Sequence, residues 1–301
     1  MITLAQRRAL PPQVIVWGLL MTNGFLIALM LALAKSATSY GMPAITYAFW
    51  QTLIAGIVLL LCTGKLRAMV ARRLTTYFLI SSLTGIAIPN AIGFYLVTRL
   101  GTGYVGIMYA LPPIFTLLIA TTMGLENLNW KRLTGLTIAV SACAWIVIQR
   151  HSEVSQTSLL WFALGLVIPV ALSVGNIYRS VAWPGQTSPM TLAAGTLLTS
   201  AIFLGMLAKL TETSLIMAGF RSPLLSIVVM QGFLTALTYY CAFEVQKRSN
   251  PVFYSQLGAI AAVFGLLIGV AWFDERYSLG VWLGALAVII GLRMSNRASQ
   301  G

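Results

Sequence analysis

Residues 14–34 read VIVWGLLMTNGFLIALMLALA, an apolar stretch without a charged side chain. A helix of about 20 apolar residues crosses the roughly 30 Å hydrocarbon layer of a bilayer. Because Arg7 and Arg8 precede the stretch and Ala32-Leu33-Ala34 ends it, the segment also resembles a secretory signal peptide. Its apolar part exceeds the about 7–15 residues usual for a signal peptide, so we predict a retained transmembrane helix.

The composition of the whole chain has the same character. Of the 301 residues, 58% are hydrophobic and 8% are charged, whereas a soluble domain carries about 25% charged residues. So few charges cannot cover a water-facing surface, and the sequence therefore predicts an integral membrane protein with small loops. The net charge of +13 comes from Lys and Arg placed between apolar runs. This placement indicates contact with membrane lipid headgroups and no nucleic-acid partner.

Apolar runs separated by charged, proline or glycine clusters predict an all-α protein with ten transmembrane helices. Their length favours helices over the short alternating strands of a membrane barrel. The predicted spans are residues 14–34, 43–62, 75–97, 104–123, 133–148, 159–178, 189–207, 224–245, 252–273 and 279–294.

Lys and Arg in the connecting segments predict the orientation of the chain. With a cytoplasmic N-terminus, 13 of them lie inside and 6 outside, if Arg179 is counted as a residue of a cytoplasmic loop. Positively charged loops stay on the cytoplasmic side. We therefore predict a multi-pass protein with both termini in the cytoplasm.

The two halves of the chain resemble each other at a spacing of about 148 residues. Glu126 and Gly135 follow one apolar run, and Glu275 and Gly284 follow the corresponding run in the second half. We predict two five-helix repeats, residues 1–150 and 151–301. An odd number of helices places the second copy in inverted orientation, and paired inverted copies suit alternating access.

One part of this pattern resembles a known family. Leu111-Pro112-Pro113-Ile114-Phe115-Thr116, followed by Gly124-Leu125-Glu126-Asn127-Leu128, is similar to the EamA-type repeat of the drug/metabolite transporter superfamily. The usual form has adjacent Gly and Glu after the fourth helix, whereas Leu125 separates them here. The resemblance implies a small-molecule permease, often an exporter of amino acids or other metabolites, in the inner (cytoplasmic) membrane of a prokaryotic cell.

Charged side chains are absent from the middle of the predicted spans. A fixed charge as the central substrate ligand is therefore not expected, which argues against strongly cationic drugs and sugar phosphates as substrates. Glu244, the acid nearest a span, is predicted to pair with Lys247.

Neutral amides and aromatic groups occupy the middle of the spans instead. Such a lining suits a neutral or zwitterionic small molecule, for example an amino acid or a derivative. Each of these side chains could also serve only to bond a neighbouring helix. The candidate cavity residues are Asn23, Tyr47, Trp50, Gln51, Asn90, Tyr109, Asn176, Tyr239 and Gln256.

Pro112 and Pro113 interrupt the fourth predicted helix and are the candidate hinge. Proline lacks an amide hydrogen and leaves a carbonyl of the preceding turn without its partner, so we expect a bend there. In the ninth helix, Gly258, Gly265 and Gly269 offer small surfaces for sliding.

Catalytic and metal chemistry find no support in the sequence. The single histidine, His151, lies in a polar stretch, and the three cysteines lie in apolar runs without CxxC spacing. We expect no cofactor, no metal site, no disulfide and no enzyme activity.

The alternative function is a drug or toxicant efflux transporter of the same fold. An intramembrane enzyme lacks a catalytic base, and a channel lacks a repeated filter motif. The sequence leaves the oligomeric state open, a homodimer included.

The topology can be tested with a reporter that is active only outside the cytoplasm. Fused after Gly301, it should be silent, because ten spans return the chain to the side where it began. Activity at this position would indicate an odd number of spans or the opposite orientation. Fusion after Lys35, at the end of the first predicted span, should be active and serves as the positive control.

Overall fold

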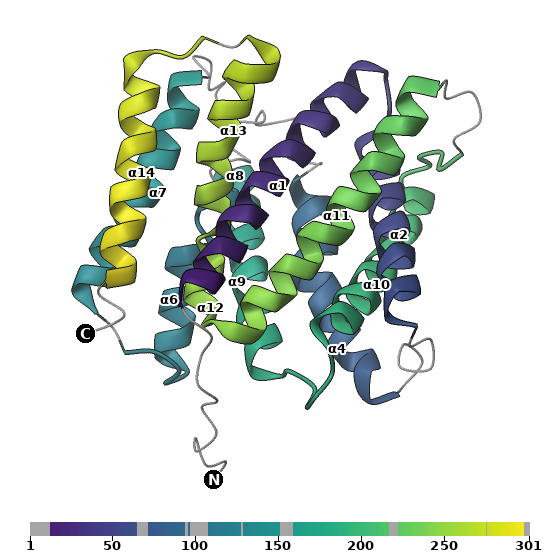
Figure 1. Cartoon of the computed structure of the whole chain (residues 1–301), viewed down its shortest axis with the longest axis horizontal. Coiled ribbons are helices and arrows are strands. Elements are labelled where there is room, and N and C mark those ends of the chain that lie inside the picture. The colour runs from purple at the N-terminus through teal and green to yellow at the C-terminus, as the bar shows by residue number, and fades with distance from the viewer. Residues whose placement is uncertain are drawn as a thin grey trace.

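The computed structural model describes residues 13–64, 72–93, 96, 108–127, 129–150, 159–216, 222–274 and 276–297. Within these ranges all regular structure is helical (Figure 1). The helices are α1 (Gln13–Ser39), α2 (Ala44–Thr63), α4 (Arg72–Ser82), the π-helix η1 (Leu83–Ala87), α6 (Pro112–Thr122), α7 (Trp130–Arg150), α8 (Leu159–Gly165), α9 (Val167–Val181), α10 (Pro189–Leu210), α11 (Ser222–Arg248), α12 (Pro251–Ser255), α13 (Leu257–Phe273) and α14 (Leu279–Arg297).

Seven described helical segments are long and apolar enough to cross a membrane. Two further apolar helices are shorter, Pro112–Thr122 and Leu279–Ser295. Large apolar side chains such as Leu61, Ile202 and Leu279 point outward along these helices, as lipid contact requires. The protein is therefore an all-α membrane protein. The seven segments are Gln13–Ala34, Ala44–Thr63, Arg72–Gly93, Ala163–Val181, Pro189–Leu210, Pro223–Arg248 and Pro251–Phe273.

Irregular backbone interrupts several of the apolar helices. The π-helix η1 follows α4 directly, and breaks separate α8 from α9 at Leu166 and α12 from α13 at Gln256. Helical backbone at residues 108–110 is broken at Leu111 and resumes as α6 at Pro112. Pro112 cannot donate an amide hydrogen bond, which explains the break at Leu111. Irregular backbone at membrane depth is stable only where it is buried in protein or lines a polar cavity.

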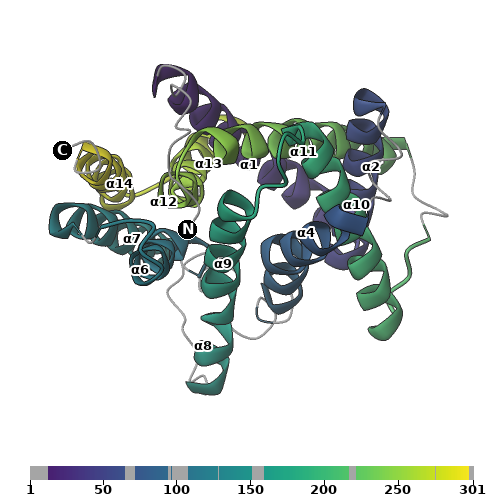
Figure 2. The same cartoon turned by 90° about the horizontal axis from the view of Figure 1, so that it is seen from below.

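The helices form two outer groups with a central set between them. Viewed from below, α7 and α14 lie at one end, and α2 and α10 lie at the other (Figure 2). Between them, α11 contacts α1 and α2, and α9 contacts α6 and η1. The functional side chains described below come largely from this central set.

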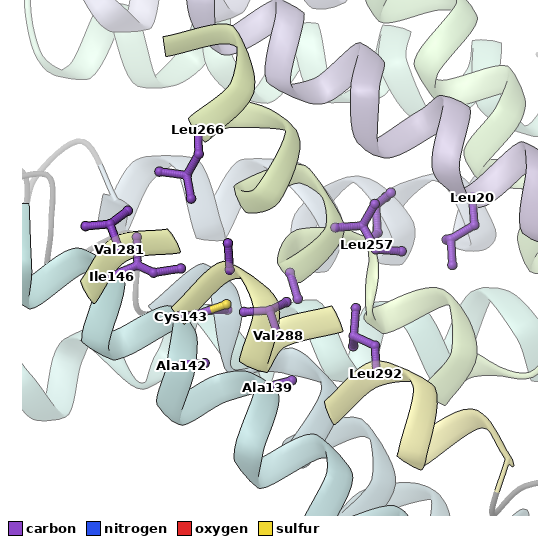
Figure 3. Close-up of a cluster of buried hydrophobic side chains, with 14 of the residues drawn as sticks. Leu20, Ala139, Ala142, Cys143, Ile146, Leu257, Leu266, Val281, Val288 and Leu292 are labelled. Carbon is purple, nitrogen blue, oxygen red and sulfur yellow. The ribbon is translucent and has the colours of Figure 1, made fainter. Parts of the chain in front are cut away.

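The main apolar core joins α1, α7, α13 and α14. Figure 3 shows Leu20, Leu257 and Val288 in this cluster, with the thiol of Cys143 near Val288. Cys143 and Cys241 are buried and act as small apolar residues, but Cys62 is exposed at the end of α2. Among the described residues all three cysteines are free thiols.

Gly135 and Gly291 bring the backbones of α7 and α14 into direct contact. A Cβ atom added to Gly135 would lie 2.6 Å from the carbonyl oxygen of Gly291, and one added to Gly291 would lie 2.5 Å from that of Gly135. Small residues allow membrane helices to approach this closely.

Replacement of Gly135 by Ala should therefore destabilise the pairing of α7 with α14. The added methyl group meets backbone atoms that cannot rotate away, and overpacking of this kind costs about 1–3 kcal/mol. Thermal unfolding of the purified protein in detergent measures the effect. Gly265→Ala is the matched control, because a Cβ at Gly265 has nothing within 4 Å. Equal melting temperatures for the two variants would contradict the proposed contact.

Candidate functional site

Three of the predicted cavity residues lie together on α2 and make helix-packing contacts. The indole nitrogen of Trp50 donates to the carbonyl of Leu215 at 2.9 Å. The side-chain oxygen of Gln51 accepts from Gln231 of α11 at 2.8 Å. Tyr47 packs in an apolar cluster with Val228. These residues tie α2 to α11 and to the segment after α10.

Asn23 and Gln256 are fully buried. In the amide orientation that satisfies both its groups, Asn23 donates to the carbonyl of Thr238 at 3.2 Å and accepts from the amide of Ala242 at 3.3 Å. It therefore ties α1 to α11. Gln256 occupies the break between α12 and α13, where its carbonyl accepts from the amides of Ala259 and Ile260.

Asn90 and Tyr109 lie side by side, although they belong to different predicted spans. The hydroxyl of Tyr109 donates to the carbonyl of Pro89 at 2.9 Å and lies 3.4 Å from the side-chain oxygen of Asn90. The phenol of Tyr239 on α11 is an electrostatic neighbour of the phenol of Tyr109. Three of the nine candidate residues thus gather around one polar region.

Asn176 accepts a hydrogen bond from Arg179, a residue that the sequence analysis assigned to a cytoplasmic loop. Arg179 does not lie in a cytoplasmic loop. It belongs to α9, within the span Ala163–Val181, and its residue surface is only 6% exposed. The assignment of Arg179 to a loop was therefore wrong, because α9 continues through Tyr178, where the apolar run ends, and carries Arg179 in its last turn.

The guanidinium of Arg179 bonds to three elements. One terminal nitrogen donates to the side-chain oxygen of Asn176 at 2.8 Å, and Nε donates to that of Gln246 of α11 at 3.0 Å. The other terminal nitrogen donates to the carbonyl of Ser81 of α4 at 3.4 Å. Arg179 also lies close enough to the phenols of Tyr239 and Tyr254 to affect them electrostatically. Arg179, Tyr239, Tyr109 and Asn90 are called the polar region below.

Two glycines and the π-helix make room for this cation. A Cβ on Gly85 of η1 would lie 2.3 Å from a terminal nitrogen of Arg179, and one on Gly175 would lie 3.3 Å from the same atom. π-helical turns occur frequently at functional sites. Here the turn brings a glycine backbone against the guanidinium.

Polar atoms around Arg179 lack hydrogen-bond partners. The buried amide nitrogen of Gln246 has none in the described structure. Tyr77 and Ser81 lie close together one helical turn apart, but neither hydroxyl makes a well-formed hydrogen bond. The ring of Tyr77 packs against Tyr178, with centroids 5.7 Å apart.

The acidic residues pair with other cations. Glu244 bonds Arg248 at 2.8 Å and not Lys247 as predicted, because the two pairing residues are four apart on α11. Glu126 binds the buried Arg132 at 2.8 Å, and Arg132 also donates to Asn250, which caps the start of α12. Glu275 lies outside the described residues.

Sequence reasoning missed Arg179, Gln246, Tyr77 and Tyr254 as members of this region. One signal was available for Arg179. Lys35-Ser36 in the first half corresponds to Arg179-Ser180 in the second, and the first pair lies inside α1. The partners of Arg179 come from α4 and α11, which only the tertiary structure brings together.

Similar proteins agree with this architecture. WAT1-related protein At3g28130 of Arabidopsis thaliana is 24% identical over 313 residues, which cover 89% of this chain and 86% of that protein. WAT1-related protein At4g28040 of the same plant is 32% identical over 68 residues, which cover 23% of this chain and only 19% of that protein. A protein of known crystal structure shares the fold, with a TM-score of 0.76 at 16% identity over 94% of this chain and 96% of the other.

Apolar helices of spanning length define a multi-pass membrane protein, and the family comparison defines its class as a transporter. The model of the EamA-like transporter family matches residues 15–148 and residues 159–297. The chain belongs to the EamA-like transporter family, which confirms the resemblance seen in Leu111–Leu128. Transporters of this family are not enzymes in general.

The candidate hinge lies where one helix ends and another begins. Pro112 and Pro113 are buried at the first two positions of α6. The hydroxyl of Ser173 on α9 donates to the carbonyl of Pro112 at 3.0 Å. The break therefore lies against the helix that carries Arg179.

Replacement of both prolines by Ala should make the helix continuous across Leu111 and shift the protein toward one access state. The readout is labelling of a cysteine introduced at Asn90, from each side of the membrane, in a background without the three native thiols. Pro189→Ala is the control, since Pro189 stands at the start of α10 after a loop. Labelling that is unchanged from both sides would contradict the hinge.

Proposed function

We propose that the protein is a permease with ten transmembrane helices in two inverted five-helix repeats, residues 1–150 and 151–301. It moves a small neutral or zwitterionic metabolite, such as an amino acid or a derivative, out of the cell by alternating access. The family model supports the duplication because it matches each half of the chain separately.

The contacts between helices support the internal repeat. Helix α1 of the first half contacts α13 and α11 of the second half. Its equivalent in the second half, α9, contacts α6 and the α4–η1 segment of the first half. Likewise α2 contacts α11, and α10 contacts α4. The pairs α2–α10 and α7–α14 join equivalent helices of the two halves. These contacts replace one another when the halves are exchanged, as a twofold relation requires, whereas the contact of α10 with α11 has no equally extensive counterpart between α2 and α4 among the described residues.

Helix direction supports the inversion and the even number of spans. In Figure 1, α1 rises from the lower side of the layer, whereas α8 and α9 descend toward it. The start of α1 and the end of α14 lie on that same lower side. Without Arg179, the Lys and Arg count is still 12 to 6 in favour of cytoplasmic termini, and a cell membrane is the expected location.

The observation that carries the proposal is the polar region between Asn90, Tyr109, Tyr239 and Arg179. Four helix interruptions occur among the helices around it, as in transporters whose discontinuous helices form the substrate site. The side-chain oxygen of Asn90, which the Tyr109 hydroxyl approaches only at 3.4 Å, can accept a hydrogen bond from an ammonium or hydroxyl group of a substrate. Donors gather at the Arg179 end of the same region.

Comparison of metabolites inside and outside cells tests the function directly. Cells that overexpress the protein should release at least one small metabolite faster than cells that lack the gene. Cells that express the Pro112→Ala, Pro113→Ala variant at equal level control for membrane overloading. Identical extracellular profiles in overexpressing and deleted cells would contradict export.

Replacement of Asn90 by Ala should reduce transport of that metabolite about tenfold, the usual effect of losing one well-placed polar contact. Gln51→Ala is the matched control, because it removes an amide that bonds α11 outside the polar region. Membrane amounts of both variants should match the unmodified protein. If Asn90→Ala transports as well as Gln51→Ala, Asn90 is a packing residue.

A further inference from the structure

Arg179 has more hydrogen-bond donors than partners. A guanidinium carries five N–H groups. Asn176, Gln246 and the carbonyl of Ser81 each accept one, which leaves two N–H groups unused among the described residues. Arginine stays charged in proteins, so the site always holds a full positive charge.

The groups around the guanidinium add donors and no negative charge. The amide nitrogen of Gln246 is buried without an acceptor, and the hydroxyls of Tyr77 and Ser81 are available to donate. The described ion pairs engage Arg132 with Glu126 and Arg248 with Glu244. Among the described residues, no carboxylate pairs with Arg179.

An uncompensated buried cation is costly. Even in the last turn of a membrane helix, where Arg179 lies, a buried ion without its partner is strongly destabilising. If Arg179 served only to connect α9 with α4 and α11, a neutral donor such as Gln would be sufficient. The glycines at positions 85 and 175 nevertheless keep space for the larger, charged side chain.

We propose that Arg179, together with the amide of Gln246 and the hydroxyls of Tyr77 and Ser81, binds the carboxylate of the transported molecule. This inference rests on the proposed function and specifies which chemical group of the substrate the site recognises. The rest of the substrate then lies toward Tyr239 and the Tyr109–Asn90 pair, where the side-chain oxygen of Asn90 suits its neutral or cationic end.

A carboxylate fits the site better than a phosphate does. A phosphate monoester carries about 1.5–2 negative charges near neutral pH, whereas Arg179 supplies one positive charge. The planar guanidinium fork matches the two oxygens of a carboxylate. The other cations described at ion-pair distance from acids are already neutralised, so they add no second charge here.

Matched acids and amides test the proposal without knowledge of the natural substrate. The probes are benzoate, phenylacetate and isovalerate, each compared with its uncharged amide at pH 7. Thermal unfolding of the purified full chain in detergent measures binding, because a ligand of the folded state raises the melting temperature. At least one acid should stabilise the protein while its amide does not. If none of the three acids stabilises it more than its amide, the proposal is wrong.

Two nearly isosteric variants test whether the acids bind at Arg179. Arg179→Gln should weaken acid binding at least about tenfold, the value of a charge-assisted hydrogen bond. Gln246→Glu places a carboxylate where the amide oxygen now lies 3.0 Å from Nε of Arg179. It should raise the melting temperature without ligand and abolish the response to acids, because the internal carboxylate neutralises the cation.

Arg248→Gln is the control. It removes an equal charge from a cation that already pairs with Glu244, and the response to acids should stay as in the unmodified protein. Acid binding that survives in Gln246→Glu, or that is lost equally in Arg248→Gln, would overturn the assignment. Gln246→Glu keeps the test valid even if Arg179→Gln does not fold.

The metabolite comparison separates this inference from the proposed function. If no metabolite depends on the protein, the permease function fails whatever acids bind. If a metabolite without an anionic group is exported, and Arg179→Gln exports it normally, the permease function stands and the carboxylate site alone is rejected.

Discussion

A polar group inside a membrane must find its partner within the protein, because lipid offers none. Most of this structure follows from that constraint. Asn23 and Gln51 are satisfied by neighbouring helices, and buried Arg132 is neutralised by Glu126. Buried side-chain atoms without a partner also occur elsewhere in the described structure, at Tyr47, Gln231 and Arg132. The surroundings of Arg179 differ because the unpaired groups there are donors beside a cation that no described carboxylate neutralises. A region whose polar groups are mostly hydrogen-bond donors is suited to a substrate that supplies acceptor oxygens.

The same constraint explains why the sequence predicted the helices well. Runs such as residues 14–34 and 189–207 have one stable backbone conformation in lipid, so their composition determines their structure. The resemblance in Leu111–Leu128 predicted the family for a similar reason, because glycine, proline and glutamate at fixed spacing mark helix ends.

The candidate site was less predictable, since its members come from helices distant in sequence. Asn90 and Tyr109 were selected as polar groups of two different predicted spans, but their contact depends on packing. Tyr47 and Trp50 have the same composition signal and yet lie in a packing contact on α2. Arg179 was assigned to a loop because an apolar run ended at Tyr178, whereas the helix itself continues to Val181. Hydropathy cannot distinguish these cases, because it contains no information about which face of a helix meets which neighbour.

The π-helix η1 shows how far this limit extends. A π-turn accommodates one residue more than an α-turn, so it rotates the helix that follows by about 100°. Ser81 and Asn90 would stand on opposite sides of an uninterrupted α-helix, but across η1 they are about 80° apart, with Ser81 toward Arg179 and Asn90 toward Tyr109. A chain shortened by one residue between Leu83 and Ala87 would keep its hydropathy profile and its length for spanning a bilayer. It would nevertheless present a different set of side chains to the polar region. The rotation of this segment about its helix axis, and not its composition, therefore decides which side chains face the interior.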